Sequence, residues 1–305
     1  MEEDVLRFDG QVAVVTGAGN GLGRSHALYL AAQGACVVVN DYGPDVGGLG
    51  RSSAPADAVV AEIRERGGVA VASHDGVHHR EGGEAIIRTA IDSFGRIDIL
   101  ICNAGIWSMQ PFAETDDAIW DRTIGVHLNG TMYASRAAWP HMLAAGYGRL
   151  VFTASSGGLY GKGGLTAYGA AKGAIYGLMR CLALEAEDMD IRVNTVLPGA
   201  ATRMVSAKTA ALWESRPGLG DPAHVTPLAA YLASRSCAVT SRAYSAGGGY
   251  FARDEVMQGA GVRLPIDAPI TVDQIMRHWD AIDDLSGATT YPDVMAYGAR
   301  MFGLE

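Results

Sequence analysis

Cysteine is scarce in this chain, and the few cysteines present lie far apart in the sequence. A zinc knuckle or a redox pair needs two cysteines within a few residues of each other, and no such pair occurs. Two of the cysteines stand in apolar runs that have the character of buried strands. The pattern predicts free, mostly buried thiols in a reducing compartment; the cysteines are Cys36, Cys102, Cys181 and Cys237.

Positive charge is also in short supply, since 24 basic and 33 acidic residues give a formal net charge of −9. Such a surface repels the phosphates of nucleic acids and anionic lipids, so we expect a small-molecule substrate and neither a nucleic-acid nor a membrane partner. No apolar run approaches the ~18 residues of a membrane span. Residues 1–11 are acidic and lack the apolar stretch of a secretory signal. We therefore expect a cytoplasmic protein.

Clusters of metal ligands are likewise missing from the sequence. His78 and His79 are neighbours, so in regular structure their side chains point apart, and no carboxylate pattern completes a metal site around them. We expect both histidines in a surface loop, and we expect no resident metal ion.

Hydrophobic residues, by contrast, are abundant: they make up 49% of the chain, whereas charged residues make up 19%. This composition supplies a large core and argues against disorder. Short β-branched runs alternate with longer amphipathic stretches, which is typical of a parallel sheet covered by helices on both faces. We therefore expect an α/β fold with a Rossmann-type, doubly wound parallel sheet of about seven strands.

The expected elements follow from hydrophobic period and turn residues. Strands are expected at residues 12–16, 36–40, 69–73, 97–102, 149–153, 191–197 and 243–245, and helices at 22–33, 56–66, 81–94, 116–145 with one break, 166–188 and 223–234. The glycine-rich segment 42–54 is too polar for the core and is expected to be an exposed loop. The sheet is expected to end before residue 247. Residues 1–305 then form one domain, with a core at 1–250 and a C-terminal helical extension at 251–305 that includes a helix at 270–282.

A glycine-rich turn directly follows the first expected strand and opens the first expected helix. Glycine permits positive φ in such a turn, and it lets backbone N–H groups and the helix N-terminus approach a pyrophosphate closely. The turn therefore predicts a dinucleotide cofactor, bound by Gly17, Gly19, Asn20, Gly21, Leu22 and Gly23.

Asp41 stands at the end of the second expected strand. A carboxylate in this place accepts hydrogen bonds from both hydroxyls of the adenosine ribose, and it repels a 2′-phosphate. Asn20 adds no positive charge to the turn, and no basic residue immediately follows Asp41. These residues favour NAD over NADP as the cofactor.

Tyr168 and Lys172 stand at the start of a long helical pattern, one turn apart, so their side chains share one face. An ammonium beside a phenol, together with oxidised nicotinamide, is expected to lower the pKa of Tyr168 from about 10 toward neutrality. Ser155 follows the fifth expected strand at its carboxyl end, where open α/β sheets bind ligands. Its spacing to Tyr168 favours it over Ser156 as the hydroxyl that binds the reacting oxygen. The three residues predict an enzyme that interconverts an alcohol and a ketone.

These motifs occur together and in a set order: TGAGNGLG at residues 16–23, CNAG at 102–105, then Ser155, Tyr168-x-x-x-Lys172 and Pro198-Gly199. Over residues 7–250 the set resembles the short-chain dehydrogenase/reductase family. The resemblance implies hydride transfer between NAD and a secondary alcohol or ketone. It also implies cofactor contacts from Asp75, Asn103, Ala104, Gly105, Tyr168, Lys172, Pro198, Gly199 and Thr202.

One segment departs from the family pattern. Many members carry Asn in a Val-Asn-Leu-x-Gly segment that helps to conduct protons to the lysine, whereas residues 126–130 here read VHLNG, with His127 in that position. If the backbone carbonyl carries the family role, the change is mild and Asn129 need not take part. The loop after Pro198 is one residue shorter than in many members, which bears on the assignment of Thr202.

A narrower resemblance lies in the segments VVVNDYGPDVGGLGRSS, AEIRERGGVAVA, VHLNG, RAAWPHM and YGRLVFTASSGGLYG. They are similar to the (3R)-hydroxyacyl-CoA dehydrogenase portion of peroxisomal multifunctional enzymes of type 2, also called type 4 17β-hydroxysteroid dehydrogenases. Those proteins share the glycine-rich insertion after the second strand and an arm beyond the usual end. The resemblance implies a homo-oligomer, a dimer or a tetramer, paired through residues 166–188 and the region around Trp139.

The substrate cleft of such a fold lies between the strand-end loops and the segment after the sixth strand. Apolar walls are expected from Trp107, Met109, Tyr160, Met204 and Trp213. Basic side chains could meet an anionic group of the substrate; they are Arg203, Lys208 and Arg216.

Three functions remain open on the sequence. The first is a dehydrogenase for 3-hydroxyacyl-CoA substrates with fatty or steroid side chains, and the second is a dehydrogenase for hydroxysteroids, terpenes or other cyclic alcohols. The third is an NAD-binding regulatory protein without catalysis. Ser155, Tyr168 and Lys172 at working spacing argue against the third.

Overall fold

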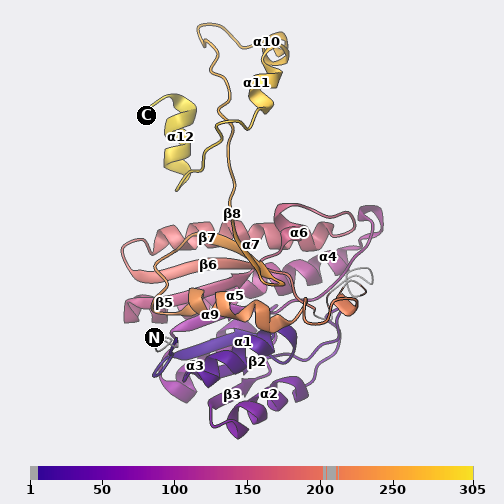
Figure 1. Ribbon diagram of the computed structural model, residues 1–305, viewed down its shortest axis with the longest axis vertical. Coiled ribbons are helices and arrows are strands. Elements are labelled where there is room, and N and C mark those ends of the chain that lie inside the picture. Colours follow the sequence, from indigo (N-terminus) through magenta and orange to yellow (C-terminus); the bar gives the residue numbers. More distant parts are fainter. Residues whose placement is uncertain (1–5, 202–203, 205–210, 212, 305) are drawn as a thin grey trace. The chain divides into compact units, whose positions relative to one another are not determined.

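A single mixed sheet flanked by helices forms the main body of the protein (Figure 1). The computed structural model describes residues 6–201, 204, 211 and 213–304. Within these residues the sheet has eight strands in the order β3-β2-β1-β4-β5-β6-β7-β8, and the pairs from β3 to β7 are parallel. The predicted Rossmann-type parallel sheet is therefore confirmed. The strands are β1 Val12–Thr16, β2 Cys36–Asn40, β3 Val69–Ser73, β4 Ile99–Cys102, β5 Tyr147–Thr153, β6 Asp190–Pro198, β7 Arg242–Gly247 and β8 Tyr250–Asp254.

The order of the strands reverses beside β1, which pairs with β2 on one side and β4 on the other. The chain therefore winds outward in two directions from this point, and the loops after β1 and β4 diverge to opposite faces. A crevice opens at the carboxyl ends of the strands at such a switch point. The fold places the glycine turn and the loop after β4 at this crevice.

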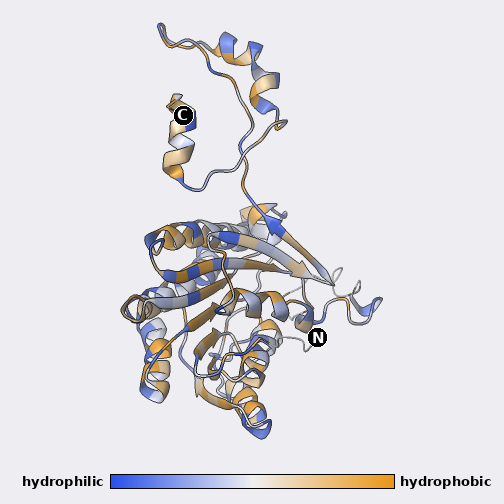
Figure 2. Cartoon of the chain, turned by 60° about the vertical axis from the view of Figure 1, so that its left-hand side comes forward, coloured by the Kyte–Doolittle hydropathy of each residue, from blue (hydrophilic) through white to orange (hydrophobic). Residues whose placement is uncertain are grey.

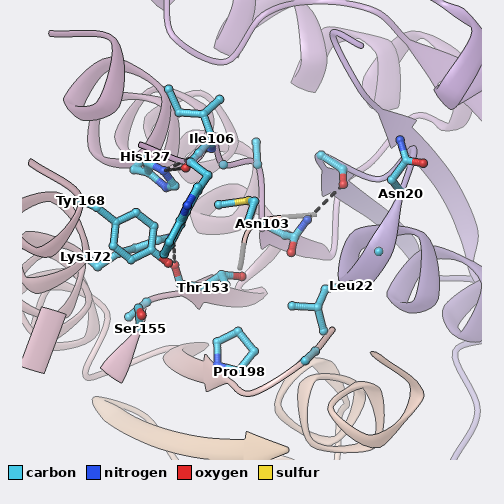
Figure 3. A pocket seen from close by; sticks show the side chains of 18 of the residues that line it. Asn20, Leu22, Asn103, Ile106, His127, Thr153, Ser155, Tyr168, Lys172 and Pro198 are labelled. Atoms are coloured by element: carbon cyan, nitrogen blue, oxygen red, sulfur yellow. Dashed lines mark hydrogen bonds between the residues drawn. The ribbon is translucent and has the colours of Figure 1, made fainter. Parts of the chain in front are cut away.

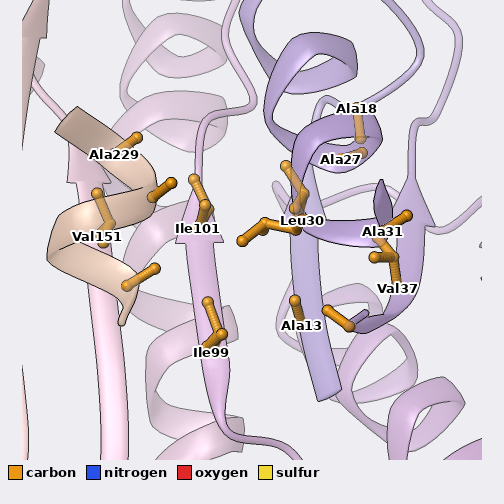
Figure 4. Packing of buried hydrophobic residues seen from close by; sticks show 14 of the residues in the cluster. Ala13, Ala18, Ala27, Leu30, Ala31, Val37, Ile99, Ile101, Val151 and Ala229 are labelled. Atoms are coloured by element: carbon orange, nitrogen blue, oxygen red, sulfur yellow. The ribbon is translucent and has the colours of Figure 1, made fainter. Parts of the chain in front are cut away.

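The sheet has two buried faces because successive residues of a strand point to opposite sides. Along β1, Ala13 and Val15 belong to one core cluster, while Val12 and Val14 belong to the other. Helices α1, α2 and α9 cover the first cluster, part of which Figure 4 shows, and helices α3, α5 and α7 cover the second. The near-continuous apolar strands expected of a parallel sheet follow from this double burial.

The helices of the main body lie close to the predicted ranges. The break expected within residues 116–145 is a π-helical turn at Gly125–Asn129, between α4 and α5. A π turn accommodates one extra residue per turn and is frequent at functional sites. The helices are α1 Gly21–Ala32, α2 Ala54–Glu65, α3 Arg80–Phe94, α4 Asp117–Ile124, α5 Gly130–Ala145, α6 Ser156–Leu159, α7 Thr166–Glu185 and α9 Thr226–Ala233.

The sheet does not end before residue 247, so that prediction was wrong. Gly248 and Gly249 take positive φ values of 57° and 81°, which allows a tight turn from β7 into β8. Tyr250 and Phe251 of β8 are 67% and 51% exposed, as an edge strand permits. The strand was missed because its exposed aromatic residues lack the alternation of a half-buried strand.

Residues 254–305 form a compact unit of their own. It contains α10 Val272–Arg277, α11 Trp279–Asp283 and α12 Val294–Phe302, and a capping box of Thr271 and Gln274 starts α10. The helix predicted at 270–282 is thus two short helices, and α12 was not predicted. Figure 2 shows hydrophobic stretches on these helices, and several large apolar side chains there are exposed, among them Met276, Trp279 and Phe302.

The cysteines are free, as predicted, with Cys102 and Cys237 buried and Cys181 exposed. The searched helices of the described chain include none that is long and apolar enough to cross a membrane.

Candidate active site

A cavity of about 1210 Å³ opens at the carboxyl ends of the parallel strands (Figure 3). It collects nearly all the residues that the sequence assigned to a cofactor or to catalysis, from segments far apart in the chain. Gly19 and Gly23 support the turn from behind and do not line it. The predicted residues that line it are Gly17, Asn20, Gly21, Leu22, Asp41, Asp75, Asn103, Ala104, Gly105, Trp107, Ser155, Tyr160, Tyr168, Lys172, Pro198, Gly199, Met204 and Trp213.

The glycine turn between β1 and α1 is packed too closely for side chains. A Cβ on Gly23 would lie 2.2 Å from the carbonyl oxygen of Gly17, and one on Gly17 would lie 2.7 Å from Cα of Ala104. Gly17 also has φ +64°, which L residues with side chains rarely adopt. These glycines therefore bring α1, the turn and the loop after β4 into contact.

The N-terminus of α1 points its first turn toward the cavity. Asn20, Gly21 and Leu22 line the cavity, and the N-cap Asn20 makes no side-chain capping hydrogen bond within the described residues. Backbone N–H groups at such an end carry partial positive charge and bind phosphate oxygens. The cradle fits the pyrophosphate of a dinucleotide, which Asn20, Gly21 and Leu22 would hold.

Asp41 is buried directly after β2, 6% exposed, and lines the cavity. Its two carboxylate oxygens accept hydrogen bonds from the backbone N–H groups of Gly19, at 2.8 Å, and Gly43, at 2.7 Å. Each carboxylate oxygen has more than one lone pair, so both can still accept from a ribose hydroxyl. The carboxylate is thus held in place by two backbone N–H groups.

Asn103 ties the loop after β4 to the glycine turn. Its side-chain amide donates to the carbonyl oxygens of Thr16, at 3.0 Å, and Gly17, at 3.1 Å. The backbone N–H groups of Asn103 and Ala104 both donate to the Thr16 hydroxyl. Asn103 therefore holds the loop after β4 against the glycine turn.

The loop after β3 is held in a similar way by a residue that the sequence did not single out. The Asn40 amide donates to the carbonyl oxygen of Asp75 at 2.9 Å, and Asp75 accepts from the Ser73 hydroxyl at 3.2 Å. Tyr42 and His78 line the cavity beside Asp75, with their rings edge to face at 5.6 Å. Only the position of Asn40 at a strand end could have indicated it.

Ser155, Tyr168 and Lys172 meet on one side of the cavity, as Figure 3 shows. Ser155 follows β5 as the N-cap of α6, and its hydroxyl accepts from Gly157 N–H at 3.1 Å. Tyr168 and Lys172 lie in the first turns of α7 and are 9% and 3% exposed. The Lys172 ammonium donates to the carbonyl oxygen of Thr153 at 2.5 Å and lies 5.8 Å from the centre of the Tyr168 ring.

Burial governs the titration of these groups. Burial lowers the pKa of Lys172 to about 7, because the charged ammonium loses its hydration. Burial also raises the pKa of Tyr168, although a side-chain hydrogen bond with Ser155 acts against this. The sequence predicted a lowered pKa for Tyr168; the chain by itself gives the opposite direction because desolvation of the phenolate outweighs the Ser155 bond. That prediction also included the positive charge of oxidised nicotinamide, which the protein does not supply.

His127 occupies the π-helical turn between α4 and α5 and lines the cavity. Its ring packs edge to face on Tyr168, with ring centres 5.1 Å apart. Its backbone carbonyl accepts from the Thr131 hydroxyl at 2.7 Å. Both the ring and the carbonyl of His127 therefore lie within the active-site structure.

The insertion after β2 closes one wall of the cavity. Val46 accepts a backbone hydrogen bond from Trp107 at 2.8 Å, and Pro44 and Gly48 line the cavity. The Trp107 ring packs on Tyr168 at 5.5 Å. The segment predicted as a simple exposed loop thus also forms part of the cavity wall.

The remaining residues predicted for the substrate cleft and the cofactor site divide into three groups. Tyr160, Met204 and Trp213 line the cavity, whereas Met109, which is 49% exposed, and the exposed Arg216 do not. Thr202, Arg203 and Lys208 lie outside the described residues.

His78 and His79 lie in a turn and not in a regular helix or strand, in agreement with the expected loop. Their ring centres lie 3.8 Å apart with a tilt of 50°, so in this turn the side chains do not point apart. Within the described chain, no group of three or more histidine, cysteine, aspartate or glutamate side chains could hold a metal ion.

Known proteins similar to this chain include a much longer enzyme and proteins of about the same length. Peroxisomal multifunctional enzyme type 2 of Mus musculus is 43% identical over 286 residues, which are 93% of this chain and 38% of that protein. A short-chain type dehydrogenase/reductase of Mycobacterium tuberculosis is 43% identical over 279 residues, which are 91% of this chain and 96% of that protein. A cyclohexanol dehydrogenase of Acinetobacter is 36% identical over 250 residues, which are 80% of this chain and 96% of that protein.

Among solved structures, the full-length peroxisomal multifunctional enzyme type 2 of Drosophila melanogaster matches with a TM-score of 0.81 and 31% identity. The match covers 98% of this chain and 50% of that one, so this chain spans half of that enzyme or less. A family model described as short chain dehydrogenase matches residues 11–213. Members act on small molecules with a nicotinamide nucleotide, and this chain is an oxidoreductase that belongs to the short chain dehydrogenase family.

Proposed function

We propose that this protein is an NAD-dependent dehydrogenase that oxidises the secondary alcohol of a 3-hydroxyacyl-CoA to the ketone, in a reversible reaction. One observation carries the proposal: Ser155, Tyr168 and Lys172 meet in a cavity whose other end is the glycine turn with Asp41 beside it. The three side chains act as the catalytic residues, and the cavity binds the cofactor and the substrate side by side.

The chain's own groups account for the handling of the proton. The Ser155 hydroxyl binds the substrate oxygen, and Tyr168, as phenolate, takes the proton of the alcohol. Lys172 binds the nicotinamide ribose and passes a proton to or from Tyr168, for which a pKa of about 7 is suited. The nicotinamide accepts the hydride when it is bound. Fixed hydrogen-bond donors and exact placement of the alcohol supply much of the rate.

The choice of NAD over NADP rests on Asp41. Its carboxylate is held in place by two backbone N–H groups, so it cannot swing away from a 2′-phosphate. The repulsion between the two negative charges in a partly buried site opposes binding of NADP. Asp75, Pro198 and Gly199 complete the proposed cofactor contacts, together with the residues around Asn103.

The acyl-CoA substrate is supported by the extent of the likeness to peroxisomal multifunctional enzyme type 2, which covers 93% of this chain. The aromatic wall of Trp107, Tyr160 and Trp213 accepts an apolar chain. A cyclic alcohol is the second candidate, because a cyclohexanol dehydrogenase is also similar to this chain and the same wall accepts a ring. A regulatory protein without catalysis has no use for the buried Tyr168 and Lys172 pair.

The test is a set of initial rates of NAD reduction with 3-hydroxyacyl-CoAs, hydroxysteroids, terpene alcohols and cyclohexanol. We expect the highest kcat/KM for a 3-hydroxyacyl-CoA, and a turnover that Tyr168→Phe abolishes while NAD binding is kept. A preference for a ring alcohol would move the proposal to the second candidate. If Tyr168→Phe kept more than about a tenth of the activity, the assignment of the acid and base would be wrong.

The cofactor choice is tested separately with Asp41→Ser. Loss of the carboxylate removes the repulsion, so kcat/KM with NADP should rise at least about tenfold relative to NAD. Asp45→Ser, in the insertion that follows Asp41, is the matched control and should leave the ratio unchanged. An unchanged ratio in Asp41→Ser would contradict the role of Asp41.

Three further properties belong to the same proposal: a cytoplasmic location, a homo-oligomer of two or four chains, and one catalytic domain that includes residues 251–305. Light scattering after gel filtration measures the mass of the assembly, and cell fractionation measures the location. Removal of residues 255–305 should lower activity if the extension belongs to the catalytic domain.

A further inference from the structure

His127 has no part in the proton transfer proposed above, yet it is one of the most buried polar residues of the active site. Its side chain is 1% exposed. Burial, with the nearby charge of Lys172, holds the pKa of His127 well below its usual value, so the ring is neutral. A neutral imidazole carries a single N–H, and the position of that proton decides what the ring can bind.

The contacts of the ring to the backbone run through Nε2. Nε2 lies 2.9 Å from the carbonyl oxygen of Ile106 and 3.2 Å from its N–H. When Nε2 carries the proton it donates to the carbonyl, and when it does not it accepts from the N–H, so either tautomer joins the ring to Ile106. Nδ1 is buried and has no hydrogen-bond partner among the described residues. Within the described chain, the ring therefore acts through Nε2 alone.

Two rings contact Tyr168: that of His127 and that of Trp107. Its own ring meets Tyr168 at 85° with centres 5.1 Å apart, and Trp107 meets Tyr168 at 67° with centres 5.5 Å apart. Trp107 follows Ile106, whose backbone His127 holds. Edge-to-face pairs of this kind resist sliding of the ring between them.

The opposite side of His127 is closed by the loop after β4. A Cβ on Gly105 would lie 2.7 Å from Cε1 of His127, so the ring fills the space that a side chain at Gly105 would need. The imidazole is thus confined between Gly105, the Ile106 backbone and the Tyr168 ring, as Figure 3 shows for the labelled residues.

We propose that His127 is a positioning residue: through Nε2 it fixes the backbone at Ile106, and with Trp107 it holds the ring of Tyr168 against Ser155. This inference rests on the proposed function, in which Tyr168 is the acid and base. The Tyr168–Ser155 hydrogen bond lowers the pKa of Tyr168. A loosened ring therefore loses both its placement and part of its acidity.

Two polar variants and one apolar variant test the two ring nitrogens of His127 separately. The amide nitrogen of His127→Gln reaches the position of Nε2, whereas that of His127→Asn reaches only the position of Nδ1; His127→Leu supplies neither. We expect His127→Gln to keep kcat within about threefold, and the other two variants to lose about tenfold or more. In His127→Asn and His127→Leu, the acidic limb of the plot of log(kcat/KM) against pH should shift to higher pH by about half a unit or more, because the phenolate of Tyr168 then forms only at higher pH.

Two measurements keep a folding defect apart from this effect. Melting temperature and NAD affinity, from fluorescence titration, should stay close to the wild-type values in His127→Asn. The added methyl group of Gly105→Ala would displace the His127 ring while Nε2 is kept, so this variant should also shift the acidic limb to higher pH. Ultraviolet titration of tyrosine, as the difference from a Tyr168→Phe background, reports the Tyr168 pKa without turnover.

The outcomes divide cleanly. A kcat of His127→Gln near that of the wild type, with a raised Tyr168 pKa in His127→Asn and His127→Leu, supports the proposal. Equal activity of His127→Asn and His127→Gln would overturn it, and so would a fall in kcat with an unmoved acidic limb. If the wild type oxidised none of the alcohols, the proposed function would fail, while the tyrosine titration would still decide the role of His127.

Discussion

Replacement of Lys172 by Met should flatten the pH dependence of stability of the protein without ligands. Lys172 is 3% exposed and its ammonium has one described hydrogen-bond partner, the carbonyl oxygen of Thr153. Burial lowers its pKa from 10.5 to about 7 in the folded chain. Between these two values the unfolded chain binds a proton that the folded chain has released.

The sign follows from proton linkage. Because the unfolded state binds more protons in this range, the free energy of unfolding rises as the pH increases from about 7 toward 10.5. The limiting slope is about 1.4 kcal/mol per pH unit, and it is smaller near the folded pKa, so the gain between pH 7 and pH 9 is about 2 kcal/mol. Met has no titrating group and a similar volume, so Lys172→Met should lack this gain.

Urea unfolding of wild type and Lys172→Met at pH 7, 8 and 9 measures the difference directly. Groups that are remote from Lys172 are common to both proteins and cancel in the comparison. Two curves that run parallel within about 0.5 kcal/mol would refute the reasoning, since Lys172 would then titrate alike in the folded and unfolded chains.

Two further predictions concern groups away from the catalytic residues. Burial lowers the pKa of His26 to about 4, so the free energy of unfolding falls by up to about 3 kcal/mol as the pH drops from 6.5 to 4. The variant His26→Asn keeps a hydrogen-bond partner for Thr226, and acid unfolding curves should show that it loses less stability over this range. Arg149 is 1% exposed and donates to several backbone carbonyls, so Arg149→Met should lower the free energy of unfolding in urea by about 3 to 5 kcal/mol. Arg192 is more exposed, so Arg192→Met should lower it by less than about 1 kcal/mol.

The sequence was most informative where one physical requirement decides a residue. The first three strands were predicted residue for residue, because buried parallel strands need continuous apolar runs bounded by turns. The glycine turn and the spacing of Ser155, Tyr168 and Lys172 likewise indicated one cavity, and the structure brings these residues together. Their catalytic roles stay predictions until the variants are measured.

Sequence patterns were least informative where contacts join segments that are remote in the chain. The backbone bond between Trp107 and Val46 leaves no mark in either segment, so the insertion was expected only as a loop. The contact between the rings of His78 and His79 was not predicted, because the sequence does not give the backbone angles of the turn that brings them together. The direction of the Tyr168 pKa depended on the depth of burial, which periodicity does not measure.

The site therefore joins a part that the fold fixes and a part that this chain adds. Parallel strands bring Asp41, Asn103 and Ser155 to one edge of the sheet regardless of the loops, since each follows the carboxyl end of a strand. The orientation of Tyr168 depends instead on rings held by Ile106 and the insertion after β2. Substitutions at the strand ends should then impair cofactor binding, and substitutions in the insertion or at His127 should change kcat and the choice of alcohol while cofactor binding is kept.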